Sequence, residues 1–221
     1  MKRFFALIAI SSLFVACGGP EGTAVESKDA VDAAAETTTE LVASAQYNVD
    51  PAASIVNWEG AKVAYGHVGT VPVTTGQLMV AEGNLVGGKF SLDLRKMECT
   101  DIEDAEKNGK LIGHLMSPDF FDTEKFPMAE FTITQVQPAA ADAGHSHNIT
   151  GNLTMKGEER SITIPASVTM EGDMLKASTP KFTIDRNEWG VNYNSSSLEG
   201  IAKDNIINDN IGLQIELVAG K

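Results

Sequence analysis

The chain has 221 residues, of which 30 are acidic and 17 are lysine or arginine, and its formal net charge is −13. A surface this acidic repels phosphate backbones, which excludes nucleic acid as a favoured partner. The same charge argues against electrostatic docking onto anionic lipid, so any membrane attachment must come from elsewhere in the chain.

The first 16 residues predict an export signal. Two basic residues follow Met1, and Phe4 to Ala16 is an uncharged run of apolar and small residues. This run is shorter than the roughly 20 apolar residues that span a bilayer. Cys17, directly after it, resembles the cysteine of a bacterial lipobox, which receives lipid such as palmitate and becomes the mature N-terminus; Phe14 stands where that motif usually has leucine. The alternative is an ordinary cleaved signal followed by an incidental cysteine.

Residues 17–46 predict a lipidated N-terminus followed by a tether. From Gly18 to about Gln46 the sequence is dominated by Ala, Thr, Glu, Ser and Gly, contains no aromatic residue, and carries six acidic residues against one lysine. Such a segment buries too little apolar surface to offset the entropy of ordering it, so we expect a disordered, extended spacer. If Cys17 is acylated, Cys99 is the only thiol left, and the folded body must be stable through packing without an internal disulfide.

Residues 47–221 predict a single all-β domain. Four stretches alternate apolar and polar residues as half-buried strands do: residues 90–95, 149–155, 162–170 and 211–217. Glycine-containing turns at 82–84, 156–158 and 171–173 separate such stretches and indicate hairpins. Pro165 indicates an edge or a bulge within its strand. Short strands joined by tight turns favour an antiparallel sandwich or barrel.

One interval interrupts the strand pattern. Residues 100–103 (Thr-Asp-Ile-Glu) resemble a capping box that opens a helix, with Ile112, Leu115 and Met116 on its apolar side. Ser117-Pro118 then predicts the start of a second, short helix that ends near Phe121. This insertion has more large apolar side chains than a solvent-exposed connection needs. We therefore expect either a lid over one end of the core or the wall of a ligand cavity.

Several short motifs follow one another along the body. They are HVG (67–69), GGKF (87–90), HLMSPDFFD (114–122), KFP (125–127), Phe131, ITGNLTMKG (149–157), FTIDR (182–186) and WG (189–190). Their order resembles that of the YceI-like family, and the resemblance spans residues 47–217. It implies an extended, lipocalin-like antiparallel barrel of about eight strands whose apolar interior holds a long polyisoprenoid chain. The N-terminal cysteine and the acidic spacer are not part of that pattern and mark a lipoprotein version.

The resemblance also directs attention to the side chains around a ligand. The candidate apolar walls are Trp58, Phe90, Leu92, Leu115, Phe120, Phe121, Phe126, Phe131, Phe182, Trp189 and Tyr193. A packed core would use the same residues, so composition alone leaves a ligand cavity and a filled interior both open.

Three polar residues match family motif positions: His67, His114 and Arg186. Arg186 shares strand parity with Phe182, so a regular strand points it inward, where it must be paired or meet a polar group of the ligand. Its candidate partners are Asp119, Asp122 and Asp185. For the histidines, structural hydrogen bonding competes with contact to a ligand head group.

No residue is assigned a catalytic or metal-binding role, and no cofactor is expected. Ser195-Ser196-Ser197 lacks the Gly-x-Ser-x-Gly elbow of serine hydrolases, and His145-Ser146-His147 has no third ligand at a recognisable spacing. The interpretation is a bacterial envelope lipoprotein that carries or sequesters an isoprenoid lipid, either polyprenyl or quinone. Gly18 weakly favours the outer membrane, with the barrel facing the periplasm or the exterior. The alternatives are an interaction or stress protein with a filled core and an enzyme acting on the bound lipid; a homodimer is also open.

Overall fold

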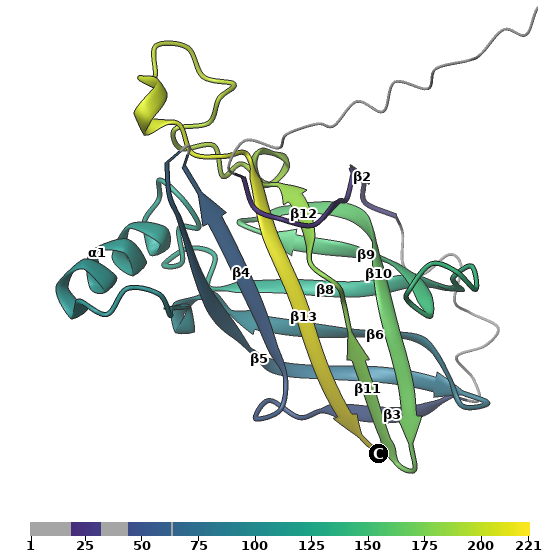
Figure 1. Cartoon of the computed structure of the whole chain (residues 1–221). Coiled ribbons are helices and arrows are strands. Elements are labelled where there is room, and N and C mark those ends of the chain that lie inside the picture. Colours follow the sequence, from purple (N-terminus) through teal and green to yellow (C-terminus); the bar gives the residue numbers. More distant parts are fainter. Residues whose placement is uncertain (1–18, 32–43, 63) are drawn as a thin grey trace, which may run out of the picture.

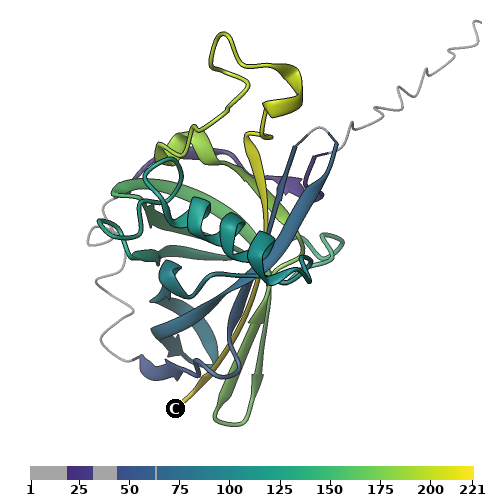
Figure 2. The ribbon, with the colours of Figure 1, turned by 90° about the vertical axis from the view of Figure 1, so that its left-hand side faces the viewer.

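Alternating apolar residues close this chain into an antiparallel barrel with one helix beside it (Figures 1 and 2). The computed structural model describes residues 19–31, 44–62 and 64–221. Its strands are β1 (Thr23–Ala24), β2 (Ser27–Asp29), β3 (Ala45–Val49), β4 (Ile55–Ala61), β5 (Gly66–Ala81), β6 (Asn84–Asp93), β7 (Glu98–Cys99), β8 (Met128–Pro138), β9 (His147–Met155), β10 (Glu158–Glu171), β11 (Met174–Ser178), β12 (Phe182–Asp185) and β13 (Asn210–Gly220). The α-helix is α1 (Ala105–Met116), and the 3-10 turns are η2 (Leu94–Lys96), η3 (Arg186–Trp189) and η4 (Lys203–Asn205).

Eight strands form the closed ring. Around the barrel the order is β4, β5, β6, β8, β9, β10, β11 and β13. The ring is closed by β13, which pairs with β4 through Gly212–Glu216. Every pairing in the ring is antiparallel. The predicted barrel of about eight strands is therefore confirmed. Among the described residues, no helix is long and apolar enough to span a membrane.

The predicted hairpin turns are present at the expected residues. Glu82 and Gly83 adopt φ values of 51° and 79°, and Lys156 and Gly157 adopt 51° and 83°. Two consecutive positive φ angles match the twist of a two-residue hairpin, and glycine at the second position carries no Cβ penalty. Pro165 lies in β10 between the residues that pair with β2 and those that pair with β11. The missing N–H therefore falls where this edge of β10 passes from one partner to the next.

The insertion between β7 and β8 differs from the prediction in two ways. Helix α1 begins after Asp104, whose carboxylate accepts a hydrogen bond from the Lys107 N–H, so Thr100 is not its N-cap. Ser117 ends α1 and accepts the Phe120 N–H in a turn, so the predicted second helix is absent. Both errors arise because several residues in this interval are suited to capping, and tertiary contacts select among them.

The N-terminal spacer is only partly as expected. We call residues 19–31 the strap, because they lie in the barrel wall between β12 and β10. β1 runs parallel to β12, while β2 runs antiparallel to β10 with Lys28 opposite Ser161. The prediction of an unpacked spacer is therefore wrong for the strap, since two sheet edges supply backbone partners that composition does not reveal. The predicted signal peptide, Cys17 and residues 32–43 lie outside the described residues.

A single buried side chain fixes the end of the strap. Asn152 on β9 is 4% exposed, and its amide group forms a two-way bond with the main chain of Val31. The Val31 N–H donates to Oδ1 at 3.1 Å, and Nδ2 donates to the Val31 carbonyl at 2.7 Å. Val25 packs against the core from the same segment. The strap thus supplies both hydrogen-bond partners of this buried amide.

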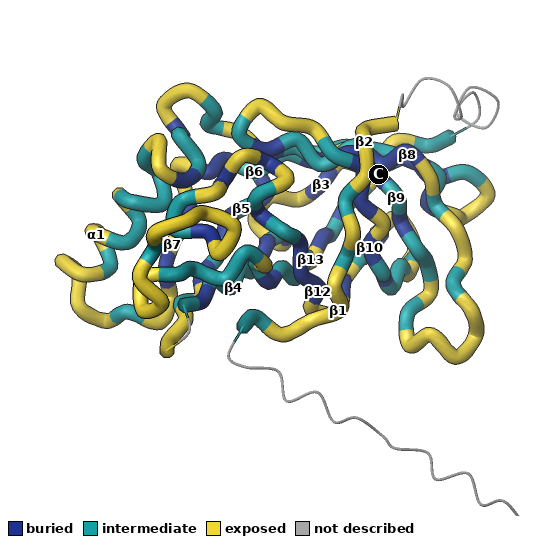
Figure 3. Tube along the Cα trace, turned by 90° about the horizontal axis from the view of Figure 1, so that it is seen from above, coloured by how far each residue is buried: buried dark blue, intermediate teal, exposed yellow. Residues whose placement is uncertain are grey.

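The interior of the barrel is unevenly filled. At the end formed by β3, β11 and the C-terminus, the side chains of Val73, Leu78, Leu175 and Ala219 are 0–1% exposed, and we call this the filled end (Figure 1). The opposite end, which we call the mouth end, is bounded by the β4–β5 hairpin, the segment 94–127 and the segment 186–209. Viewed from above, buried positions lie along the strands of the ring, whereas α1 has exposed and intermediate positions and none that is buried (Figure 3).

Candidate ligand-binding site

A cavity of about 560 Å³ occupies the barrel towards the mouth end. Its inner part is lined by core side chains of the strands, among them Phe90 and Phe131, whose ring centroids are 5.7 Å apart. Its outer part reaches Tyr65 in the β4–β5 hairpin and Asn194 and Asn205 in the segment 186–209. A volume in this range suits one slender ligand, and the preponderance of apolar lining suits an apolar one.

Most of the apolar residues expected from the sequence lie at this cavity. Nine of them line it: Trp58, Phe90, Leu92, Leu115, Phe120, Phe121, Phe131, Phe182 and Tyr193. They come from β4, β6, α1, the turn that follows α1, β8, β12 and the segment after η3. The strands turn alternate residues inward, and the insertion adds its own aromatic side chains across the mouth end.

Two of the predicted wall residues lie elsewhere. Trp189 is fully buried in η3, and its indole N–H donates to the Leu153 carbonyl at 2.8 Å, so it is a packing residue behind the wall. Phe126 packs over Gly157 in the β9–β10 turn, and the Lys125 ammonium lies 4.8 Å from its ring centroid. Sequence order does not distinguish an aromatic side chain that faces the cavity from one that supports the wall, and these two lie outside the cavity lining.

Arg186 borders the cavity but is committed to the protein itself. Its side chain is 2% exposed and donates to the carbonyls of Val191 at 2.6 Å, Ile207 at 3.1 Å and Asn208 at 3.1 Å. It also lies 3.4 Å from the Asp209 carboxylate. Burial lowers the pKa of Arg186, and the charges of Asp209 and Asp185 oppose that shift. Arg186 therefore holds the segment 186–209 over the mouth end.

The sequence left the partner of Arg186 open and did not include the correct one. Asp119 pairs with His114, and Asp185 caps η3 by accepting the Asn187 N–H at 2.9 Å. Asp209 is the observed partner. Burial acts to raise the pKa of Asp209, but hydrogen bonds from Ser195, Ser196 and Asn187 and the charge of Arg186 outweigh it, and the pKa is lowered.

The two predicted histidines both line the cavity, and both are hydrogen-bonded. His114 lies in the last turn of α1 with its Nε2 2.9 Å from the Asp119 carboxylate. Its ring makes edge contacts with Phe120 and Tyr193, each at a centroid distance of 4.9 Å. This aromatic cluster joins α1 to the segment 186–209. His67 lies on β5 with its Nδ1 3.0 Å from the Asp101 carboxylate.

Lys156, in the turn between β9 and β10, binds both of the segments that bound the mouth end, 94–127 and 186–209. Its ammonium donates to the Pro118 carbonyl at 3.2 Å and to the Gly190 carbonyl at 3.1 Å. Burial lowers the pKa of Lys156, while the charges of Asp122 and Asp119 oppose the shift. The segments 94–127 and 186–209 are thus cross-linked by polar contacts, and the mouth end has a defined shape.

Sequence reasoning missed the aliphatic part of the lining. Ile162 and Ile164 on β10, Leu153 and Met155 on β9, and Ile211, Leu213 and Ile215 on β13 all face the cavity. Their two-residue spacing was visible in the sequence and predicts an inward face. Spacing alone, however, does not indicate whether an inward face meets a cavity or a packed core.

Trp58 shows how the wall is built locally. Trp58 is directly opposite Gly69 in the β4–β5 pairing, and the indole ring lies over that glycine. A Cβ at Gly69 would lie 2.5 Å from the Trp58 ring and still closer to the Glu98 carbonyl, so only glycine fits there. The buried indole N–H of Trp58 has no hydrogen-bond partner in the described part of the chain.

The architecture defines the class of this protein as a closed antiparallel barrel with an apolar cavity at one end. Residues 47–219 match the YceI-like domain family, and the chain belongs to that family. It is 30% identical to protein YceI of Salmonella newport (strain SL254) over 139 residues, which are 62% of this chain and 68% of that protein.

Two solved structures share the fold. The crystal structure of BcnA from Burkholderia cenocepacia superposes with a TM-score of 0.57 at 22% identity, covering 77% of this chain and 99% of that one. A polyisoprenoid binding domain from Saccharophagus degradans, implicated in plant cell wall breakdown, gives a TM-score of 0.54 at 18% identity, covering 79% and 97%. At these identities the likeness establishes the fold.

Proposed function

We propose that this chain is a cell-envelope lipoprotein that binds one long isoprenoid lipid, a polyprenyl chain or an isoprenoid quinone, and carries or sequesters it. The observation that carries this proposal is the cavity of about 560 Å³ lined by aromatic and aliphatic side chains at the mouth end. Burying an apolar chain there gains roughly 25 cal/mol per Å² removed from water. The fold shared with a polyisoprenoid binding domain supports the same ligand class.

The polar groups at the mouth end fit a binding role. His67 and His114 line the cavity, and within the described part of the chain each has a second ring nitrogen that forms no hydrogen bond. A carbonyl or hydroxyl at one end of a lipid is suited to such a nitrogen. Arg186 is excluded from this role because its donors are directed to backbone carbonyls and Asp209. We therefore assign head-group contact to the histidines.

We propose binding rather than catalysis. The serine run that sequence analysis considered is structural, because Ser195 is fully buried and shares a 2.8 Å hydrogen bond with Ser197. His145 is likewise tied into its loop, with one ring nitrogen 2.9 Å from the Ala143 carbonyl and the other 2.9 Å from Asn148. Neither group faces the cavity.

Lipidation of Cys17 gives the cavity an orientation. Gly19 packs beside Asn208, and Pro20 lies over Gly212 at the start of β13, so the strap begins at the mouth end. Two residues span at most about 7 Å of extended chain. An acyl anchor on Cys17 therefore holds the mouth end close to the bilayer, and a lipid then travels only a short distance between membrane and cavity.

Organic extraction of the purified protein, followed by mass spectrometry, tests the proposal directly. The expected result is one isoprenoid per chain, or uptake of one ubiquinone, menaquinone or polyprenol when each is offered. Cys17→Ser is expected to release a membrane-bound protein into the soluble fraction without changing uptake. An empty protein that takes up none of the three lipids contradicts the binding proposal and favours an interaction protein.

A further inference from the structure

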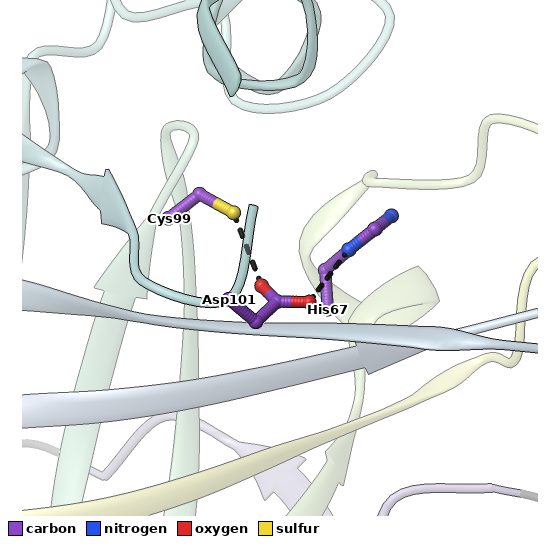
Figure 4. A group of neighbouring side chains, drawn as sticks. All are labelled: His67, Cys99 and Asp101. Carbon is purple, nitrogen blue, oxygen red and sulfur yellow. Dashed lines mark hydrogen bonds and ion pairs between the residues drawn. The ribbon is translucent and has the colours of Figure 1, made fainter. Parts of the chain in front are cut away.

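Three metal-ligating side chains converge beside the cavity, on residues that sequence analysis did not connect. His67 lies on β5, Cys99 ends β7, and Asp101 follows two residues later (Figure 4). The β5–β7 pairing places Cys99 opposite Gly69, which brings it near His67 on the neighbouring strand. The imidazole nitrogen, the sulfur and a carboxylate oxygen all lie within 4.8 Å of one another.

The cluster is held together by short polar contacts. His67 Nδ1 lies 3.0 Å from Asp101 Oδ2, and the Cys99 thiol donates to Asp101 Oδ1 at 3.1 Å. The Val68 N–H also donates to Oδ1 at 3.1 Å. Burial acts to raise the pKa of Asp101, but the hydrogen bonds from His67, Cys99 and Val68 outweigh it and lower the pKa. Burial and the bond to Asp101 raise the pKa of the Cys99 thiol.

These separations are close to those between the ligands of a small transition-metal ion. Zinc bonds of about 2.0–2.3 Å in a tetrahedral arrangement place neighbouring ligand atoms about 3.3–3.8 Å apart. The contacts of 3.0 and 3.1 Å are slightly shorter than this and end on different oxygens of Asp101, and the ligand atoms of the group lie within 4.8 Å of one another. The ion is admitted when the three side chains rotate towards a common point.

We propose that His67, Cys99 and Asp101 form a binding site for a divalent transition metal of the zinc type. Imidazole and thiolate ligands favour zinc, cobalt, nickel and copper over calcium and magnesium, which prefer oxygen. When the metal binds, the thiol proton leaves to solvent and the sulfur–metal bond takes its place. The Val68 N–H continues to orient the carboxylate from outside the metal's ligands.

The site is accessible and has room for a further ligand. The side chains of His67 and Asp101 are 28% and 33% exposed, whereas Cys99 is buried. Three protein ligands leave the fourth position of a tetrahedral zinc ion to water or another small donor. The bound ion would tie β5 to the segment after β7, at the rim of the cavity.

Cobalt titration of the full-length chain carrying Cys17→Ser tests this site, because Cys99 is then the only thiol. We expect one Co²⁺ per chain with a thiolate-to-cobalt charge-transfer band, and displacement of that ion by Zn²⁺. Cys99→Ser should abolish the band, and His67→Gln and Asp101→Asn should weaken Zn²⁺ binding at least about tenfold. His145→Gln, on a loop away from the cluster, is the matched control and should leave both unchanged.

Thermal melting keeps the test decisive if a variant folds poorly. An ion that binds only the folded chain raises its Tm, so Zn²⁺ should raise the Tm of the Cys17→Ser chain and not that of its Cys99→Ser derivative. Absence of a charge-transfer band, or Zn²⁺ binding that persists in Cys99→Ser, overturns the proposal and leaves the cluster as a hydrogen-bonded link. Neither readout involves lipid, so the result is independent of the proposed function.

Discussion

The two ends of the barrel are built from the same alternating strands, yet one is packed and the other is hollow. At the filled end, Val73, Leu78 and Leu175 are 0–1% exposed. At the mouth end, the inward side chains of Trp58, Leu213 and Ile215 are only partly buried and face the cavity. Alternation therefore determines which residues point inward, whereas the connections determine whether the interior is filled.

The connections differ between the two ends. Tight turns at 82–83 and 172–173 join the strands at the filled end, where the side chains meet directly. The long segments 94–127 and 186–209 cover the mouth end and hold it open through Arg186 and Lys156. A filled interior and a cavity thus coexist in one barrel.

The largest loss of stability is expected on removing Arg186, whose hydrogen bonds hold the segment 186–209 at the mouth end. Arg186→Met removes the guanidinium that three backbone carbonyls and Asp209 share, and leaves those groups buried without a partner. Breaking such a pair costs about 3–5 kcal/mol in the free energy of unfolding, measured by urea denaturation. Arg160→Met removes the 3.8 and 3.9 Å ion pairs with Glu188 and Glu158 and an exposed 3.5 Å hydrogen bond to the Glu159 carbonyl, and should cost less than about 1 kcal/mol. Equal losses would show that Arg186 does not fasten this end.

Truncating one leucine at each end compares how tightly the filled end and the mouth end are packed. Leu175→Ala, at a fully buried position, should cost about 2–5 kcal/mol, because it opens a new void in a packed region. Leu213→Ala should cost at most about half as much, because its side chain already faces a cavity and its removal creates no new enclosed void. Similar losses in urea unfolding at both positions would mean that the mouth end is packed as well.

The strap should contribute to stability despite its composition. A chain that begins at Ser44 loses the pairing of β1 and β2 and leaves the Asn152 amide without Val31. We expect a loss of about 2–4 kcal/mol in the free energy of unfolding. Asn152→Ala should destabilise the full-length chain and leave the short chain nearly unchanged, because the partner of the amide belongs to the strap. If the short chain unfolds at the same temperature as the full-length protein, the strap contributes no stability and is only a spacer.

The two tryptophans should respond differently to phenylalanine. Trp189→Phe removes the donor to the Leu153 carbonyl in a packed region and should cost about 1–3 kcal/mol. Trp58→Phe removes an indole N–H that has no hydrogen-bond partner among residues 19–31, 44–62 and 64–221, so its cost should stay below about 1 kcal/mol. Thermal unfolding of both variants makes the comparison. The reverse order would place the tighter packing at the cavity wall.

The sequence predicted those parts of the fold that are decided locally. Strand alternation and glycine turns at Gly83 and Gly157 depend on neighbouring residues only, and these predictions were confirmed. The strap was missed because its partners, β10 and β12, lie far along the chain. Asp209 as the partner of Arg186 was missed for the same reason.

The candidate site divides along the same line. The candidate wall residues Phe90, Phe131 and Phe182 lie on strands and line the cavity, because a strand fixes which face a residue takes. Trp189 and Phe126 lie in turns and connections, where parity has no meaning, and their environments depend on Leu153 and Gly157. The His67–Cys99–Asp101 cluster combines two distant segments, and the spacing of these residues in the sequence does not predict that their side chains meet.

Filling the cavity without disturbing the packed core tests most directly whether the cavity binds a lipid. Gly60 on β4 lines the cavity, and a Cβ there would meet no atom within 4 Å, whereas one at Gly151 would lie 2.4 Å from the Phe131 ring. Gly60→Leu is therefore the clean substitution, and Gly113→Leu, which adds the same side chain on the exposed side of α1, is its control.

Native mass spectrometry of both variants, offered the same isoprenoid quinone, reports the bound lipid per chain. Gly60→Leu is expected to lose lipid binding with unchanged stability, and Gly113→Leu is expected to bind as the parent chain does. Unchanged binding in Gly60→Leu, together with the loss of about 1–3 kcal/mol that overpacking a filled core would cause, would contradict lipid binding in this cavity.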